Sequence, residues 1–184
     1  MRRLANTSVK NANPVSSVFL WLAGLFAAFV LSACAQEKGA APVTSKTVAD
    51  FFPVKIAGKT LRMQVAVNPP EMQRGLMGRK DLGPDDAMIF VYAKPQQLSF
   101  WMRNTPTPLD IGFFNASGIL EEVYPLYPFN ENAVPSRSSR LQLAVETNQN
   151  WYRENGIKPG AQIDLKALSA ALRARGFDPR RFGF

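Results

Sequence analysis

The chain has 184 residues and a net charge of +8, with 22 Lys and Arg against 14 Asp and Glu, a single Cys and no His. Without histidine, serine-histidine-aspartate triads, cysteine-histidine pairs and histidine-ligated zinc sites are excluded. The modest positive charge suits an anionic membrane or envelope surface, and the chain lacks the interleaved aromatic and basic motif of a nucleic-acid-binding module, so nucleic acid is not expected as a partner.

Residues 1–33 have the order of a secretory signal peptide. Three basic side chains, Arg2, Arg3 and Lys10, precede an uncharged apolar run over residues 18–31. This run is too short for a membrane span, which needs about 20 residues. A basic region, an apolar region and then small residues are typical of a signal for export, which is the predicted fate of this chain.

The only cysteine, Cys34, lies three residues after the end of this apolar run. Leu31-Ser32-Ala33-Cys34 resembles the bacterial lipobox, where a signal peptidase cuts before the cysteine and the thiol carries diacylglycerol with acyl chains such as palmitate. We therefore expect Cys34 to be lipidated and to attach the protein to a membrane. Because Ala35 and Gln36 follow instead of Asp, the resemblance implies an outer membrane location, facing the periplasm.

The sequence predicts one globular domain in the exported chain. Removal of residues 1–33 leaves 19 basic and 14 acidic side chains, for a net charge of +5. Residues 34–50 have no hydrophobic period and are predicted to be a flexible tether. Residues 51–167 are predicted to form a single β domain, and residues 168–184 a C-terminal helix with a basic, aromatic tail.

The first half of the domain is predicted to contain a hairpin and a short helix. Residues 52–56 and 61–67 have strand patterns, and a turn at Gly58 separates them. Asn68 is a suitable helix cap, Pro69 suits the first helical position, and Glu71 completes a capping box. The helix is expected to end near Gly78.

The remaining elements are predicted to be mostly strands in a meander. Strand patterns cover residues 88–92, 98–102, 109–114, 119–124, 141–145 and 162–165. Residues 124–140 are predicted to be a long loop, and Asn148 to cap a short helix that stops at Gly156. These elements predict a mainly β fold with short helices, built as an antiparallel β-sandwich or barrel.

Five segments match a known family in order: Arg74-Gly75-Leu76-Met77, Arg79, Phe100-Trp101-Met102-Arg103-Asn104-Thr105, Pro108-Leu109-Asp110 and Glu146. Over residues 52–165 the chain is similar to the bacterial and archaeal family called domain of unknown function 192. The resemblance implies a jelly-roll-like β fold that is often exported or lipid-anchored. It implies no established activity.

A candidate cluster is chosen from these segments and from the cost of burying charge near apolar strands. Its members are Arg74, Arg79, Trp101, Asn104, Thr105, Asp110 and Glu146. The simplest interpretation is structural: the carboxylates pair with arginines or accept backbone hydrogen bonds, Asn104 and Thr105 cap a loop, and Trp101 lies in the core. The alternatives are an acid-base pair of Asp110 and Glu146, and stacking of a sugar on Trp101.

Two classes of function remain open from the sequence. The favoured one is a non-enzymatic, lipid-anchored envelope protein that binds a glycan, a small ligand or a protein partner. The alternative is a hydrolase or lyase that uses Asp110 and Glu146, which would require both carboxyl groups in one cleft at about 5–9.5 Å. No cofactor and no metal site are expected in either case.

The C-terminal segment has a pattern of its own. Leu165, Leu168 and Leu172 make one apolar helical stripe, which Gly176 is placed to end. Phe177, Phe182 and Phe184 then surround Arg180 and Arg181. Such a tail suits the headgroup layer of a membrane, whereas the alternative is a helix packed on the sandwich with a loose, solvated end.

Overall fold

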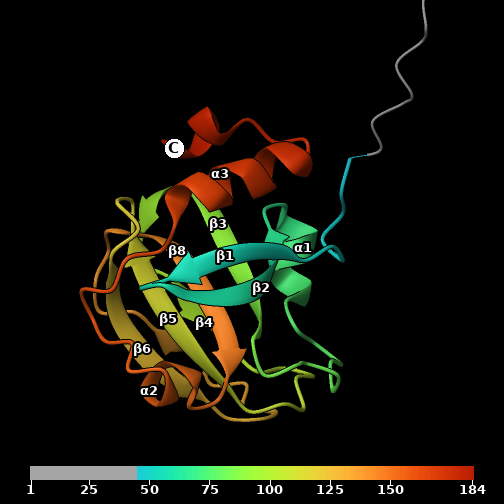
Figure 1. Ribbon diagram of the computed structural model, residues 1–184. Coiled ribbons are helices and arrows are strands. Elements are labelled where there is room, and N and C mark those ends of the chain that lie inside the picture. The colour runs from blue at the N-terminus through green and yellow to red at the C-terminus, as the bar shows by residue number, and fades with distance from the viewer. Residues whose placement is uncertain (1–44) are drawn as a thin grey trace, which may run out of the picture. The chain divides into compact units, whose positions relative to one another are not determined.

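Residues 45–184, which the computed structural model describes, fold around one six-stranded sheet (Figure 1). In spatial order its strands are β1 (Phe52–Ile56), β2 (Lys59–Ala66), β3 (Asp86–Gln96), β8 (Leu141–Asn148), β5 (Leu109–Asn115) and β6 (Leu120–Leu126). Only β2 and β3 are parallel. Two short strands, β4 (Ser99–Phe100) and β7 (Val134–Pro135), pair separately.

The predicted mainly β, sandwich-like fold with short helices is confirmed. The main sheet has two edges, β1 and β6, and so does not close into a barrel. The predicted signal peptide, Cys34 and the tether as far as residue 44 lie outside the described residues. Within residues 45–184, no helix is long and apolar enough to cross a membrane.

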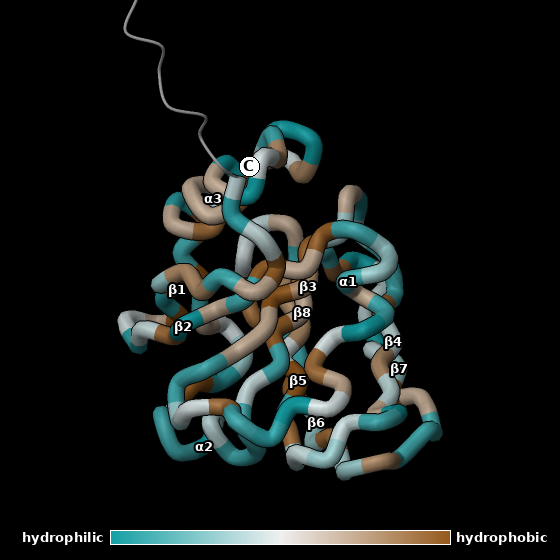
Figure 2. Tube along the Cα trace, turned by 90° about the vertical axis from the view of Figure 1, so that its right-hand side faces the viewer, coloured by the Kyte–Doolittle hydropathy of each residue, from teal (hydrophilic) through white to brown (hydrophobic). Residues whose placement is uncertain are grey.

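Both faces of the sheet are buried. Along β3, Ile89 and Val91 belong to one apolar cluster, whereas Met88 and Phe90 belong to another. Successive side chains of a strand point to opposite faces, so the two clusters are the cores on the two sides of the sheet. We call the cluster that contains Ile89 and Val91 the Ile89 core. Figure 2 shows the hydrophobic residues gathered along β3, β8 and β5, with hydrophilic residues in the surrounding turns.

Short helices cover these two cores. They are α1 (Pro69–Arg74), α2 (Trp151–Glu154), α3 (Leu165–Ala174) and the 3₁₀ helix η1 (Pro179–Phe182). Asp164 caps α3 by accepting the Ala167 N–H at 2.9 Å, and Leu168 and Leu172 of α3 are buried in the Ile89 core. Trp151 and Tyr152 of α2 join the same core, at the opposite end of the sheet from α3 (Figure 1).

The strand order corrects the predicted meander. β8 lies between β3 and β5, so the strand nearest the C-terminus pairs with two strands that precede it by many residues. This pairing is possible because residues 97–108 leave the main sheet and carry only the two-residue β4. The order of strands in space depends on such long-range pairing, which local periodicity does not encode.

Other boundaries also differ from the prediction, beginning with α1, which ends at Arg74 with Gly75 as its cap and not near Gly78. Residues 162–165 make only isolated bridges, from Gln162 to Ile119 and from Ile163 to Ile56, because Asp164 already begins α3. Asn148 lies in β8, and Asn150 is the residue that precedes α2, in the left-handed conformation with φ of 73°.

The aromatic residues of the C-terminal tail lie against the protein. Phe182 is buried in the Ile89 core, and Phe177 and Phe184 pack against that core. Gln142 Nε2 donates a hydrogen bond to the carbonyl oxygen of Phe182 at 2.6 Å, which ties the tail to β8. The helix thus packs on the sheet, as one of the two interpretations expected, but the tail after it is packed as well and is not a loose, solvated end. Contact of this tail with a membrane stays a prediction.

Candidate functional site

The first part of the site is the turn that follows α1. The Asn68 N–H donates to Glu71 Oε2 at 3.1 Å, and Gly75 ends the helix with φ of 46°. A glycine suits this position because L side chains rarely adopt such a φ. Beyond it, the Gly78 N–H donates to the Asn104 carbonyl at 2.8 Å, and Thr107 Oγ1 donates to the Arg79 carbonyl at 2.7 Å. These bonds hold the arginine motif beside the aromatic, proline-containing loop.

Two adjoining pockets open along this junction, and we call them together the arginine cleft. The inner pocket has a volume of about 220 Å³ and is lined by Val48, Ala49, Gln64, Glu71, Arg74, Gly75, Met77, Arg79 and Met88. The outer pocket has a volume of about 340 Å³ and is lined by Pro70, Gln73, Arg74, Met77, Trp101, Arg103 and Asn104. Arg74 and Met77 line both, so the pockets share a wall.

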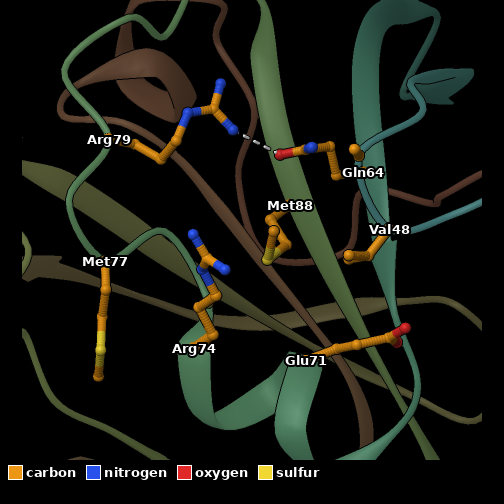
Figure 3. Close-up of a pocket in the computed structure, with 9 residues that line it drawn as sticks. Val48, Gln64, Glu71, Arg74, Met77, Arg79 and Met88 are labelled. Carbon is orange, nitrogen blue, oxygen red and sulfur yellow. Dashed lines mark hydrogen bonds between the residues drawn. The ribbon is translucent and has the colours of Figure 1, made fainter.

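Positive charge dominates the inner pocket. In Figure 3 the guanidinium groups of Arg74 and Arg79 point into the same space, opposite Gln64 and Met88. Arg79 donates to Gln64 Oε1 at 2.9 Å and is also paired with the exposed Asp81. Among residues 45–184, Arg74 has no carboxylate within ion-pair distance. One guanidinium group in the pocket is therefore available to a ligand.

The one acidic residue of the inner pocket is already neutralised. Glu71 Oε1 accepts from Arg175 Nη2 at 2.6 Å, and its other oxygen accepts the N–H groups of Val67 and Asn68. Burial alone would raise the pKa of Glu71, but these hydrogen bonds and the Arg175 charge outweigh burial and hold the pKa below its usual value. Glu71 therefore stabilises the helix start and does not cancel the charge of Arg74.

The outer pocket combines an aromatic face with a further arginine. Trp101 is 40% exposed, although its neighbours Phe100 and Met102 are buried, which corrects the interpretation that Trp101 lies in the core. The Arg103 guanidinium lies 5.5 Å from the centre of the Trp101 ring, in a cation–π arrangement. Asn104 has φ of 54°, and its carbonyl oxygen accepts the hydrogen bond from the Gly78 N–H.

A second exposed aromatic segment runs beside Trp101. Tyr127 is 59% exposed and Phe129 is 63% exposed. The Phe129 N–H donates to the carbonyl oxygen of the buried Thr105 at 3.1 Å, and the Met102 N–H donates to the Asn130 carbonyl at 2.8 Å. Phe129 also has φ of 58°, a rare and strained conformation for an aromatic residue, and such strain clusters at ligand-binding sites.

Glu146 lies beneath the inner pocket. It is directly opposite Met88 on β3 and Ile111 on β5, and only 4% of it is exposed. A Cβ atom on Gly75 would lie 3.8 Å from Glu146 Oε2, and this oxygen has no hydrogen-bond partner among the described residues. Burial raises the pKa of Glu146 to about 8, so at neutral pH the group is largely the uncharged acid.

Asp110 lies in a different environment. Its Oδ2 accepts the N–H of Asn150 at 2.8 Å, at the start of α2. Burial raises the pKa of Asp110, while the Asn150 N–H and the charge of Arg153 oppose that effect. The carboxyl group lines a third pocket of about 290 Å³, which is separate from the arginine cleft.

The sheet separates the two carboxylates of the candidate cluster. In the β5–β8 register, Ile111 is opposite Glu146, and Asp110 is opposite Thr147. Neighbouring residues in a strand point to opposite faces, so Asp110 and Glu146 do not meet in one cleft. Neither forms an ion pair with Arg74 or Arg79. The structure thus brings Arg74, Arg79, Trp101 and Asn104 together, with Thr105 as support.

Several charged or polar residues of these pockets were not in the candidate cluster, among them Gln64, Arg103, Arg153 and Lys158. Arg103 lies in the same motif as Trp101 and Asn104, so its position in the sequence could have identified it as a site residue. Gln64 interrupts an otherwise apolar stretch of buried β2 residues, and this is a weaker indication of a site residue. Arg153 and Lys158 stand in no motif.

Comparisons with known proteins agree with this fold. The model of the family DUF192, described as "Uncharacterized ACR", matches residues 52–165. A crystal structure of a protein of unknown function from Novosphingobium aromaticivorans is 32% identical, with a TM-score of 0.57 over 61% of this chain and 83% of that one. A Sinorhizobium meliloti protein, provisionally described as a transcription regulator, is 27% identical, with a TM-score of 0.59 over 62% of this chain and 95% of that one. No curated protein matches the chain.

Proposed function

Since this chain belongs to the DUF192 family, whose activity is uncharacterized, we propose that it is a non-enzymatic envelope module that binds an acidic glycan in the arginine cleft. The observation that carries the proposal is the Arg74 guanidinium, which has no ion-pair partner among residues 45–184 and faces the same space as Arg79. Arginine presents a planar fork of N–H donors that matches a carboxylate, and such paired, charge-assisted hydrogen bonds are strong and directional. Gln64 adds an amide at the same wall.

The aromatic residues support a sugar as the body of the ligand. Trp101 offers an exposed ring at the outer pocket, and Tyr127 and Phe129 are exposed on the segment that is hydrogen-bonded to residues 102–105. An aromatic face binds the apolar C–H face of a sugar ring, while amide and guanidinium groups bind its hydroxyl and carboxylate oxygens. A row of uronic acid residues would place a carboxylate at the inner pocket and a ring on Trp101.

Among residues 45–184, the carboxyl groups near the arginine cleft do not form an acid-base pair, and this supports binding over catalysis. Of the carboxyl groups around the inner pocket, Glu71 is held by Arg175, and Glu146 lies under Gly75 and is only 4% exposed. Asp110 is on the other face of the sheet. Hydrolysis of a glycosidic bond by two carboxyl groups requires that both groups lie beside the same bond of the substrate.

The sequence supports a location at the membrane surface. Lipidation of Cys34 would attach the domain to the envelope through residues 35–50, at a place where acidic glycans are present. Labelling with a palmitate analogue tests this step: wild type should incorporate the label, and Cys34→Ala should not. Equal labelling of the two proteins would contradict the lipid anchor and would leave the glycan site to be judged separately.

The binding experiment uses oligomers of glucuronic acid or galacturonic acid, with neutral glucose oligomers of the same length as the matched ligands. Titration calorimetry on the domain should show binding of the acidic oligomers only. Arg74→Ala should weaken it by about 10- to 100-fold, the value of a charged hydrogen bond. Trp101→Ala should weaken it to a lesser extent, and Arg140→Ala, an exposed arginine that lines neither pocket, should have no effect.

Two results would contradict the proposal. One is equal affinity for neutral and acidic oligomers, because the arginines would then contribute nothing. The other is binding of the acidic oligomer that Arg74→Ala does not change, because the ligand would then occupy another surface.

A further inference from the structure

A third pocket, on the face of the sheet that carries Asp110, has features of a ligand site of its own. Its volume is about 290 Å³, and it is lined by Asp110, Val123, Tyr152, Arg153, Gly156, Ile157, Lys158 and Pro159. Pockets for drug-sized ligands measure about 300–1,000 Å³, so this one, at the lower end of that range, suits a small molecule. It shares no lining residue with the arginine cleft.

The pocket is rigidly built. A Cβ atom on Gly112 would lie 2.3 Å from Tyr152 Oη, so only a glycine leaves room for the Tyr152 ring at this place. Tyr152 Oη donates to the Val145 carbonyl at 3.0 Å, and the Ile157 N–H donates to the Tyr152 carbonyl at 2.8 Å. These contacts fix the floor of the pocket and the segment after α2 that forms its apolar wall.

One buried charge in the pocket lacks a cation. Asp110 is only 7% exposed, yet no Lys or Arg of the described residues lies within ion-pair distance of it. Among residues 45–184, its single hydrogen bond is the one that Oδ2 accepts from Asn150. A buried carboxylate is costly without compensation, and a protonated amine of a ligand at the second oxygen would supply it.

Two cations stand at the exposed rim of the same pocket. Arg153 and Lys158 both line it, and neither is ion-paired with any described residue. Arg153 is close enough to lower the pKa of Asp110, but it does not contact the carboxylate. Between the acidic and the basic groups lie the apolar side chains of Val123, Ile157 and Pro159.

We propose that this pocket binds a free, zwitterionic amino acid with an apolar side chain. Its ammonium group binds Asp110, its carboxylate binds Arg153 and Lys158, and its side chain packs on Val123, Ile157 and Pro159. The site is independent of the arginine cleft, so either can be present without the other.

Leucine and two analogues test the assignment of each charge. Isothermal titration or NMR titration compares L-leucine with 3-methylbutylamine, which lacks the carboxylate, and with N-acetyl-leucine, which lacks the ammonium group. Leucine should bind at least tenfold more tightly than either analogue, because each analogue loses one charged contact. Amide shifts should appear at Asp110, Tyr152 and Ile157, and not at Arg74 or Arg79.

Two variants confirm the place of binding. Asp110→Asn keeps an oxygen that accepts the Asn150 N–H but removes the charge, and it should weaken leucine binding at least tenfold. Lys158→Ala, at an exposed position where folding is not at risk, should weaken binding of leucine but not of 3-methylbutylamine. Arg140→Ala serves as the control and should bind leucine as wild type does.

The proposal is overturned if leucine shows no saturable binding at millimolar concentration. It is also overturned if either analogue binds as tightly as leucine, or if Asp110→Asn binds leucine with wild-type affinity while keeping the wild-type melting temperature. None of these results bears on the binding of acidic sugars by Arg74.

Discussion

Glu146 makes the stability of the domain depend on pH in a direction opposite to that of most carboxylates. Burial raises its pKa from 4.5 to about 8, and no group within residues 45–184 donates a hydrogen bond to its Oε2 atom. Between these two values the unfolded chain loses the proton and the native protein keeps it, so stability falls as pH rises. The stabilising contribution of Glu146 is fully present below about pH 4.5, where the carboxyl group is protonated in both states. It is lost above about pH 8, where the group is ionised in both states.

The size of this effect follows from the same two pKa values. Each pKa unit corresponds to about 1.4 kcal/mol, so the gap between 4.5 and about 8 amounts to about 5 kcal/mol of unfolding free energy. Glu146→Gln removes the titration while it keeps the shape of the side chain. Urea denaturation of both proteins at several pH values should show the variant gaining up to about this amount, relative to wild type, from pH 4.5 to pH 8.

The comparison between the two proteins matters more than either profile alone. Glu71 has a lowered pKa and therefore loses its stabilising contribution as pH falls, which bends both curves in the same way at acidic pH. Glu131→Gln, at an exposed position, provides the control and should run parallel to wild type. A constant difference between Glu146→Gln and wild type across pH 4.5–8 would refute the reasoning, because Glu146 would then have an ordinary, solvated carboxyl group.

Three other tests, two of them with a matched control variant, address contacts within the domain. Gly112→Ala should destabilise the domain by about 1–3 kcal/mol, because the new Cβ atom would lie 2.3 Å from Tyr152 Oη; an unchanged melting temperature would contradict this packing. Arg175→Ala should cost at most about 3–5 kcal/mol in denaturant unfolding, because it breaks a partly buried pair with Glu71, whereas Arg180→Ala, which breaks an exposed pair with Asp178, should cost less than about 1 kcal/mol. Asp110→Ala leaves the Asn150 N–H without its acceptor and should cost about 1–3 kcal/mol by the same assay, while Asp110→Asn, which retains an acceptor, should cost less.

The local elements were predictable because they are encoded by nearby residues. The hairpin of β1 and β2, the cap of α1 and the apolar stripe of α3 each depend on a turn, a cap or a period within about ten residues. The same is true of β5 and β6, which pair across the turn that ends at Gly118. In all of these, local propensity and tertiary packing favour the same structure.

The position of β8 and the exposure of Trp101 were not predictable in this way. An apolar run such as Phe100-Trp101-Met102 suggests a buried strand, yet Trp101 turns outward, since β4 ends at Phe100 and the chain turns away to meet Gly78 and Asn130. The charge state of Glu146 likewise depends on Met88, Ile111 and Gly75, which are distant in sequence. The family motifs identified Asp110 and Glu146 as candidate residues, but only the strand register determines on which face of the sheet each side chain lies.

That register also decides which chemistry the domain can support. Asp110 and Ile111 are adjacent in β5, and their partners Thr147 and Glu146 are adjacent in β8, so the two carboxyl groups differ by one position in the same ladder. A one-position difference in a strand always changes the face of the sheet. Asp110 consequently joins α2, Arg153 and Lys158, whereas Glu146 joins Gly75 under the arginine cleft. An enzyme that used both carboxylates on one bond would need them on the same face, and in this protein the strand register places them on opposite faces.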